Sequence, residues 1–266
     1  MAYTTDLPFF KYSALGNDYI VLDPATFTHP LTVPVIQAIC HRNHGIGADG
    51  ILYGPHTIDG NIHLQIFNPD GSEAEKSGNG IRIFSKYLFD TGYITDDHFT
   101  LHTKGGAVYV KRLNPTADII QVDMGAPIFT PADIPITGDT ALSIPLTINH
   151  QDLTVNCVSM GNPHCVIFTD ELSKDTTCTL GPKIETHPMF PNKTNVQFVK
   201  VISNTRIQIE IWERGAGYTL ASGSSSCAAA AVAMHHNLVD AAITVAMPGG
   251  TIDIAQSDNN HMLMTG

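Results

Sequence analysis

The chain has 266 residues, of which 43% are hydrophobic and 15% charged, and its formal net charge is −11. This length suits two globular domains, each able to enclose an apolar core. Because Lys and Arg together number only 14 and form no basic run, the chain would repel a polyanion, and we expect no nucleic-acid partner.

The first residues, MAYTTDLPFFKYSALGND, lack the basic and apolar regions of a signal peptide. No apolar run elsewhere reaches membrane-spanning length, so we expect no membrane segment. These features predict a cytoplasmic protein.

Strands and two helices are predicted along the chain. Short β-rich runs separated by Gly, Pro, Asn and Asp clusters predict strands at Tyr19–Leu22, Ile62–Asn68, Ala107–Arg112, Ile119–Asp123, Val155–Ser159, Val196–Val201 and Arg206–Glu213. Helical stretches run from Asn79 to Thr91 and from Ser224 to Asn237, the second with an Ala-rich centre of high helix propensity. The pattern predicts an α/β (α+β) fold in which strands wrap a central helix in each domain.

The Pro-rich segment Ala126–Pro145 is the predicted crossing between the domains. We accordingly expect an N-terminal domain over 1–126 and a C-terminal domain over 127–257. Residues 258–266 are expected to return to the N-terminal domain.

The two halves of the chain share one motif at a constant spacing. FNPDGSEAEKSGNGIRIFSKYL contains Ser77, IWERGAGYTLASGSSSCAAAAVA contains Ser222, and 222 − 77 = 145. The same offset pairs Trp212 with Phe67, and ALGNDYIV with SMGNPHCV. A repeat of this length indicates two similar domains joined head to tail, and such a pair usually meets across a cleft.

Ser77 and Ser222 lie just before the two predicted helices. Unpaired backbone N–H groups and the positive end of the helix dipole collect there, so a small molecule with a carboxylate could be held between the two helix starts. Serine before a helix is more often simply an N-cap. Their matching places in a duplicated frame favour a shared site.

The motifs resemble the diaminopimelate epimerase family. ALGNDYIVLD, HRNHGIGADGILY, FNPDGSEAEKSGNGIR, VSMGNPHCV, FPNKTNVQFV and WERGAGYTLASGSSSCAAA are similar to that family's motif blocks and follow its order. The resemblance implies two pseudo-symmetric domains, each a β-barrel-like sheet around a central helix. It also implies a cofactor-independent enzyme, without pyridoxal phosphate, that interconverts LL- and meso-diaminopimelate in lysine and cell-wall biosynthesis. Two cysteines on opposite faces of the substrate α-carbon would exchange its proton.

The chain departs from the family at those two cysteines, whose places are taken by Ser77 and Ser222. A thiol near a helix start can form a thiolate, whereas a serine hydroxyl needs an activating base. We therefore expect severely impaired turnover. Two origins stay open, an engineered double replacement that traps substrate and a naturally inactive paralogue. Tyr218, where the family usually has Glu, and the end of the chain at HMLMTG favour the second.

The family's binding residues are retained. The resemblance implies that the distal amino and carboxylate groups of the substrate contact Asn68, Asn162, Asn195 and Arg214. It implies that backbone N–H groups for the reacting carboxylate come from Gly78, Asn79, Gly223 and Ser224, and that Asn17 and Glu213 fix the amino groups. For any one of these Asn residues, a structural place in a turn is the commoner role.

Other classes are weakly supported. The five cysteines lack CxxC spacing and the 13 histidines lack a ligand pattern, so we expect neither a disulfide framework nor a metal site. GIGADG (Gly45–Gly50) fits a dinucleotide-binding pattern but leads into a β-like run, which predicts a turn. A serine hydrolase and a binding protein without turnover are the rival functions, and neither serine lies in GxSxG. The family resemblance implies a homodimer.

Overall fold

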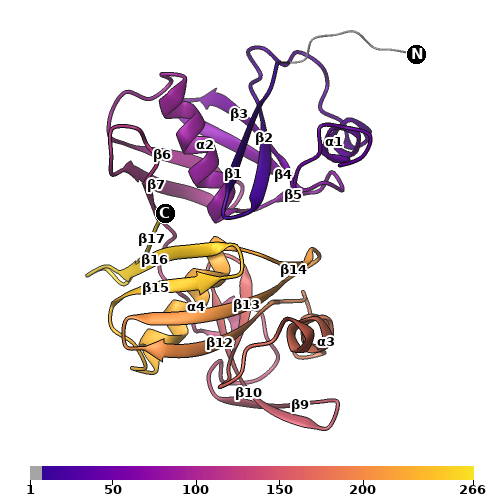
Figure 1. Cartoon of the computed structure of the whole chain (residues 1–266), viewed down its shortest axis with the longest axis vertical. Coiled ribbons are helices and arrows are strands. Elements are labelled where there is room, and N and C mark those ends of the chain that lie inside the picture. Colours follow the sequence, from indigo (N-terminus) through magenta and orange to yellow (C-terminus); the bar gives the residue numbers. More distant parts are fainter. Residues whose placement is uncertain (1–7) are drawn as a thin grey trace. The chain divides into compact units, whose positions relative to one another are not determined.

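The computed structural model describes residues 8–266, which fold as two compact units divided between Val122 and Asp123 (Figure 1). We call them the N-terminal unit and the C-terminal unit. Each unit is a curved, mixed sheet with one helix on its inner face and a second on its outer face.

The N-terminal unit has a sheet in the order β1-β2-β3-β4-β6-β7-β8, with the short β5 beside the end of β4. Neighbours are parallel at β2–β3 and β4–β6 and antiparallel elsewhere. The strands are β1 Phe10–Ala14, β2 Asn17–Leu22, β3 Ile51–Ile58, β4 Asn61–Phe67, β5 Glu73–Ala74, β6 His98–Thr103, β7 Gly106–Arg112 and β8 Ile120–Asp123. The helices are α1 Val33–Cys40 and α2 Gly78–Asp90.

The C-terminal unit repeats this arrangement. Its sheet order is β9-β10-β11-β12-β13-β15-β16-β17, with β14 beside the end of β13 and parallel neighbours at β11–β12 and β13–β15. The strands are β9 Ile144–Ile148, β10 Gln151–Ser159, β11 Pro163–Phe168, β12 Asn195–Ser203, β13 Arg206–Glu213, β14 Gly217–Thr219, β15 Ala242–Met247, β16 Gly250–Gln256 and β17 Met262–Thr265. The helices are α3 Lys174–Glu185, α4 Gly223–His235 and the short 3₁₀ helix η1 Pro131–Asp133.

The internal repeat predicted from the sequence is present as a repeat of structure. Gly78, the first residue of α2, and Gly223, the first residue of α4, are 145 apart (223 − 78), the same offset as the motifs. The strand orders β1-β2-β3-β4-β6-β7-β8 and β10-β11-β12-β13-β15-β16-β17 correspond one to one, including both parallel pairs. The predicted α/β class with a central helix in each half is confirmed.

The inner helix of the C-terminal unit contacts strands on all sides, namely β10–β13 and β15–β17. This surrounding explains its Ala-rich sequence, because small side chains let the strands approach the helix closely on every face. Ala228, Ala229 and Ala230 are all fully buried. Both inner helices begin and end within two residues of their predicted bounds, and each of the seven predicted strands overlaps an observed strand.

Two helices on the outer faces were not predicted. Proline occupies the start of α1, and α3 contains Gly181 and Pro182, residues that normally interrupt helices. Gly181 has a packing reason, because a Cβ atom there would lie 2.6 Å from Cγ of Trp212. Apolar side chains of α1 and α3 complete the outer-face cores of their units, with Ile36 in the first and Ile184 in the second.

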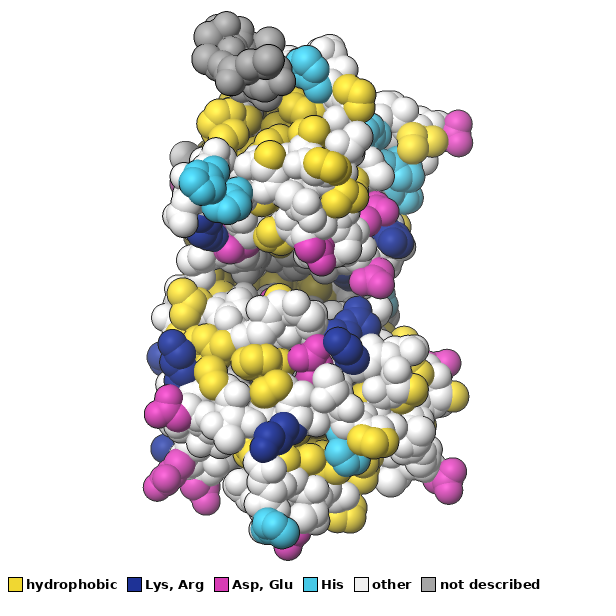
Figure 2. Space-filling model, turned by 90° about the vertical axis from the view of Figure 1, so that its right-hand side faces the viewer, with side chains coloured by type: hydrophobic (Ala, Val, Ile, Leu, Met, Phe, Trp, Pro, Cys, Tyr) yellow, Lys and Arg dark blue, Asp and Glu magenta, His cyan; other side chains and the backbone are white. Residues whose placement is uncertain are grey.

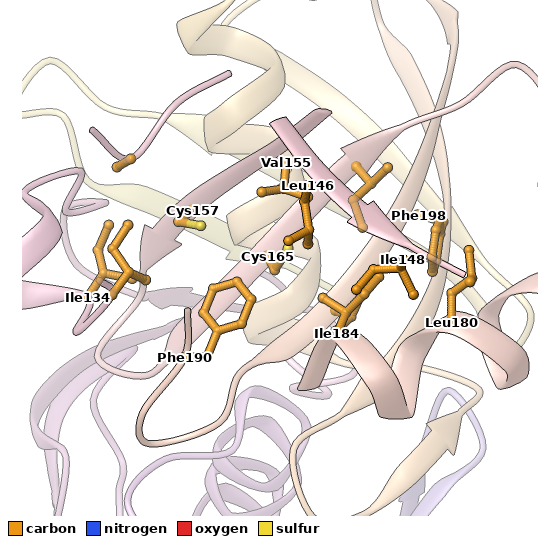
Figure 3. Close-up of a cluster of buried hydrophobic side chains, with 14 residues drawn as sticks. Ile134, Leu146, Ile148, Val155, Cys157, Cys165, Leu180, Ile184, Phe190 and Phe198 are labelled. Atoms are coloured by element: carbon orange, nitrogen blue, oxygen red, sulfur yellow. The ribbon is translucent and has the colours of Figure 1, made fainter. Parts of the chain in front are cut away.

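The Pro-rich segment 126–145, predicted as the crossing between the domains, follows directly after the division between the units. It belongs to the C-terminal unit, where Ile134, Ile136 and Ala141 are buried in the same cluster as Phe190 (Figure 3). The composition of the segment indicated a linker, whereas Ile134, Ile136 and Ala141 are buried. Residues 258–266 contain β17, which pairs antiparallel with β16 of the C-terminal unit.

On the face shown in Figure 2, the Lys and Arg side chains are scattered among acidic and neutral ones. No helix among residues 8–266 has the length and apolar character needed to cross a membrane.

Candidate active site

Ser77 caps the inner helix of the N-terminal unit. Its backbone is extended (φ −138°, ψ 115°), and its Oγ accepts a hydrogen bond from the Gly80 N–H at 3.1 Å. The Tyr19 hydroxyl on β2 lies 3.1 Å from the same Oγ. The serine is therefore a structural N-cap, as its position alone suggests, and its hydroxyl also contacts a neighbouring phenol.

Asn79, in the first turn of α2, connects the helix start to β2. The residue is 2% exposed, and its amide nitrogen lies 3.4 Å from Oδ1 of Asn17. Its Oδ1 accepts from Nη2 of Arg82 at 2.8 Å. The amide of Asn17 in turn donates to Oδ2 of Asp49 at 2.8 Å. The structure thus brings the predicted binding residues Asn17 and Asn79 together beside Ser77.

Asp18 and Asp49, the second of which accepts from Asn17, are both ion-paired. Arg42 Nη2 lies 2.8 Å from Asp18 and 2.5 Å from Asp49, and Lys11 Nζ lies 3.0 Å from Asp18. Burial raises the pKa of Asp18, but hydrogen bonds from Arg42 and Lys11 outweigh it and bring that pKa to about 2. Both carboxylates are thus paired with cations, which gives them a structural role.

Asn68, also predicted to bind substrate, lies in the turn that follows β4. Its amide donates to Oγ of Ser72 at 3.0 Å, and its backbone C=O accepts from the Gly71 N–H at 2.9 Å. Among the hydrogen bonds of the described residues, none links Asn68 to the group around Asn17 and Asn79. In this structure Asn68 has the structural role of a turn residue.

Ser222 caps the inner helix of the C-terminal unit in the same way. Its backbone angles are −149° and 124°, and its Oγ accepts from the Ser225 N–H at 3.5 Å. Ser222 is 5% exposed, and its carbonyl accepts from the hydroxyl of Ser226 at 2.8 Å. The side chain of Gln197 supports this turn by donating to Ser225 Oγ at 3.0 Å.

The first backbone N–H groups of both inner helices have no intrahelical acceptor, as at any helix start. They belong to the predicted anion-binding residues, which are Gly78 and Asn79 on α2, and Gly223 and Ser224 on α4. Gly78 and Gly223 are buried, so these donors lie in a partly desolvated environment where they interact strongly with an anion.

Asn195 holds three strand ends of the C-terminal unit together. Its amide donates to the Pro163 carbonyl at 2.9 Å, and its Oδ1 accepts from the Arg214 N–H at 2.9 Å. Asn162 lies on the same side, with its Oδ1 3.0 Å from Nε2 of His164. Asn195 is therefore bonded directly to the backbone of Arg214, and it is bonded to Pro163, the residue that follows Asn162. These contacts bring three predicted binding residues together.

His164 was not predicted from the sequence. It occupies the position equivalent to Tyr19, because 164 − 19 = 145, and it is fully buried. Burial lowers the pKa of His164 to about 3, which keeps the imidazole neutral. A neutral imidazole fixes the orientation of the Asn162 amide without adding charge beside it.

Glu213 ends β13 and Arg214 begins the turn that follows it, and this turn is anchored by Glu185 of α3, a second residue that was not predicted. Oε2 of Glu185 accepts from Nε1 of Trp212 at 2.7 Å, and Oε1 accepts from the Gly215 N–H at 3.0 Å. Because both hydrogen bonds flank Glu213 and Arg214, this buried carboxylate sets the position of the turn.

Tyr218 lies on β14. Its hydroxyl donates to Oε2 of Glu210 at 2.7 Å, and the Nζ of Lys174 lies 4.8 Å from the centre of its ring. The side chain is thus held within its own unit by a strand neighbour and by the start of α3.

The contacts of the two serines bear on the rival chemistry. In the described part of the chain, neither hydroxyl has a hydrogen bond to a histidine or a carboxylate. A serine nucleophile requires such a base within hydrogen-bond reach. The arrangement therefore gives no support to a hydrolase triad.

Three other features bear on alternative functions, namely metal ligands, a cavity and the GIGADG segment. Among residues 8–266, no group of three His, Cys, Asp or Glu side chains is placed to hold a metal ion. A cavity of about 760 Å³ in the N-terminal unit is lined by His56, His63 and His102, and contains none of the predicted site residues. GIGADG is irregular backbone with bends, and it leads into β3 rather than into a helix.

Comparisons with known proteins agree with the motifs. Residues 9–130 and 156–266 match the model of the family described as diaminopimelate epimerase. The chain is 50% identical over 262 residues to diaminopimelate epimerase 2 of Nostoc sp., covering 97% of this chain and 92% of the relative. It is 37% identical over 264 residues to the diaminopimelate epimerase of Moorella thermoacetica, covering 97% and 95%.

Solved structures resemble the fold at low sequence identity. A hydroxyproline epimerase from Agrobacterium vitis matches with a TM-score of 0.68 and 12% identity, covering 97% of this chain and 88% of that one. A probable proline racemase from Agrobacterium radiobacter gives a TM-score of 0.66 at 11% identity, with coverages of 97% and 89%. These likenesses establish the fold class.

Proposed function

Because the chain belongs to the diaminopimelate epimerase family, we propose that it is an isomerase scaffold whose substrate is diaminopimelate. The proposed reaction inverts one α-carbon by proton transfer between two residues, without pyridoxal phosphate or another cofactor. Its place is the cytoplasm, in the biosynthesis of lysine and the cell wall, and its assembly is a homodimer. Identity of 50% across 97% of the chain supports the substrate assignment.

The observation that carries this proposal is the equivalence of Ser77 and Ser222. Each is the N-cap of the inner helix in a duplicated unit, and each precedes backbone N–H groups that are free to bind an anion. We propose that both act on one substrate, with the carboxylate of the reacting carbon at these N–H groups, where negative charge grows as the α-proton leaves.

The remaining predicted residues take the binding roles. In the proposal Asn17 and Glu213 fix amino groups of the substrate. The distal end contacts Asn162, Asn195 and Arg214, where the guanidinium supplies a two-pronged donor for a carboxylate. Asn68 belongs to the same set by the family resemblance, although here its amide is bonded to Ser72.

Serine at both positions makes this chain a poor catalyst in the proposal. The contacts of Ser77 are a phenol and a backbone N–H, and those of Ser222 are backbone groups and a neighbouring serine hydroxyl. Neither environment contains a base that would activate a hydroxyl. Binding of the substrate without turnover is therefore the expected behaviour.

The test restores both thiols. The chain as it stands and the S77C/S222C variant are incubated with LL- or meso-diaminopimelate in deuterated water, and deuterium at the α-carbon is followed. We expect exchange only with the double variant. Absence of exchange in a folded double variant would refute the substrate assignment. Tyr218, which stands where the family usually has Glu, would then be the first residue to replace with Glu.

The second candidate is a binding protein that keeps the pocket without turnover. The hydrogen bonds around Asn79 and Asn195 are intact here while both acid/base thiols are missing, which favours it. Calorimetry showing tight binding of diaminopimelate, with no exchange even by S77C/S222C, would support it. Labelling of either serine by a fluorophosphonate would instead support a hydrolase.

A further inference from the structure

Arg82 is a buried cation near the start of α2. The residue is 7% exposed, and one nitrogen of its guanidinium group, Nη2, donates to Oδ1 of Asn79 at 2.8 Å. Its Nε has no hydrogen-bond partner, and no carboxylate of the described residues lies within ion-pair distance. Burial lowers the pKa of Arg82 to about 10, so the side chain still carries its charge at neutral pH.

This placement is unfavourable unless an anion is nearby. Arginine is rarely buried without a partner, because removing its charge from water costs several kcal/mol. A positive charge in the first turns of a helix also opposes the helix dipole. Side chains of a helix lean towards its N-terminus, and the bond to Asn79 shows that this one does. Negative charge at the start of α2 would offset both costs.

The duplicated fold supplies an internal comparison. The position equivalent to Arg82 is Cys227, because 227 − 82 = 145, and Cys227 is fully buried in α4. Two helix starts with the same capping serine and the same backbone therefore differ by one buried positive charge.

Other charged groups do not cancel this difference. In the N-terminal unit, the carboxylates of Asp18 and Asp49 are ion-paired to Arg42 and Lys11. The phenol of Tyr19 contacts the hydroxyl of Ser77, and the preceding residues Glu75 and Lys76 are adjacent and opposite in sign. In the C-terminal unit, the imidazole of His164 is kept neutral by burial, and Glu213 and Arg214 are adjacent and opposite in sign.

We infer that Arg82 is a positioning residue that makes the start of α2 the half of the site that holds negative charge. The orientation of the Asn79 amide, and the stability of an anion at position 77, both depend on its guanidinium. Resting on the proposed function, this assigns the thiol at position 77 of the S77C/S222C enzyme to the deprotonated base and the thiol at position 222 to the protonated acid.

Thiols introduced at the two positions measure this difference directly, without substrate. In the variants S77C and S222C, the rate of alkylation by iodoacetamide is followed against pH, and the labelled peptide is quantified by mass spectrometry. We expect the thiol at position 77 to ionise about one pH unit lower than the one at 222, a tenfold difference in ionisation constant.

Variants of Arg82 separate its charge from the effect of burial, because Ser222 is 5% exposed and burial also raises a thiol pKa. In the S77C background, R82M should raise the midpoint by about one unit, and R82K, which keeps the charge, by much less. The matched control is R112M. It removes an arginine that lies on β7 of the same unit and pairs with Asp97, and it should leave the midpoint unchanged.

Two results would overturn the inference. One is an unchanged midpoint in an R82M variant whose circular dichroism shows a folded protein. The other needs no change at Arg82 and so does not depend on that variant folding: a thiol at position 77 that ionises at the same pH as the one at 222, or higher. Neither result involves epimerisation, so both are distinct from failure of the proposed function.

Discussion

Replacement of Glu185 tests how the C-terminal unit holds the turn that carries Arg214. This carboxylate is 6% exposed at the end of α3, and it accepts hydrogen bonds from Trp212 Nε1 at 2.7 Å and from the Gly215 N–H at 3.0 Å. The ammonium of Lys193 lies 3.7 Å away. One side chain therefore ties a helix to both sides of a turn.

The magnitude follows from these contacts. A hydrogen bond to a charged group contributes about 1.5–3 kcal/mol, and E185A removes two of them. Because Trp212 is partly exposed, water can replace some of the lost interaction, and we expect a loss of about 3 kcal/mol in the free energy of unfolding. E185Q keeps one carbonyl acceptor, and its expected loss is about half as large, roughly 1.5 kcal/mol.

The assay uses the single tryptophan of the chain. Trp212 belongs to the C-terminal unit, so its fluorescence in a urea titration reports on unfolding of that unit. The control is E171A, which changes an exposed Glu before α3 and should alter stability by less than about 0.5 kcal/mol. If E185A is as stable as E171A, the anchoring role assigned to Glu185 is wrong.

Three further substitutions probe other parts of the structure. The folded-state pKa of His164 is about 3, below its ordinary value, so the unfolded chain binds a proton that the folded chain does not as pH falls below 6.5. Lowering the pH from 7.5 to 5.5 should therefore reduce the free energy of unfolding of the parent by about 1.4 kcal/mol more than that of H164Q. Equal reductions would contradict the assigned burial. The pKa of Asp18 is depressed to about 2, so D18N should be less stable at pH 7 by about 1–2 kcal/mol, with the gap closing as pH falls from 4 towards 2. An acid titration that shows a constant gap would rule this out. In G181A the new Cβ would meet Trp212 at 2.6 Å, so we expect a net loss of about 2 kcal/mol despite the better helix propensity of Ala. A thermal melt unchanged from the parent would show that the ring can move aside.

The elements that the sequence predicts well are those whose pattern is local. The strand Arg206–Glu213 alternates buried and exposed residues, and the Ala-rich run of α4 has high helix propensity, so both were located within two residues. The outer helix α3 was missed because Gly181 and Pro182 disrupt the local signal. Only the contact with Trp212, which is distant in sequence, explains why glycine is needed there.

The candidate site likewise has parts that local sequence predicts and parts that it does not. Ser77 and Ser222 could be placed at helix starts from the capping pattern and the 145-residue offset (222 − 77), and both are N-caps in the structure. Their surroundings could not be predicted. The hydroxyl of Tyr19 on β2 contacts Ser77 at the start of α2, and the carboxylate of Glu185 on α3 accepts from Gly215. Neither contact has a signature in local sequence. The burial of Arg82 likewise depends on how α2 packs.

A crystal structure of this Ser/Ser chain with diaminopimelate tests the central claim most directly. We expect one bound molecule, with its α-carboxylate at the starts of α2 and α4 and with Oγ of Ser77 and Oγ of Ser222 on opposite sides of the same α-carbon, each within about 4 Å of it. A ligand that contacts only one of the two serines, or an α-carbon with both hydroxyls on the same side, would contradict the proposed two-residue proton transfer.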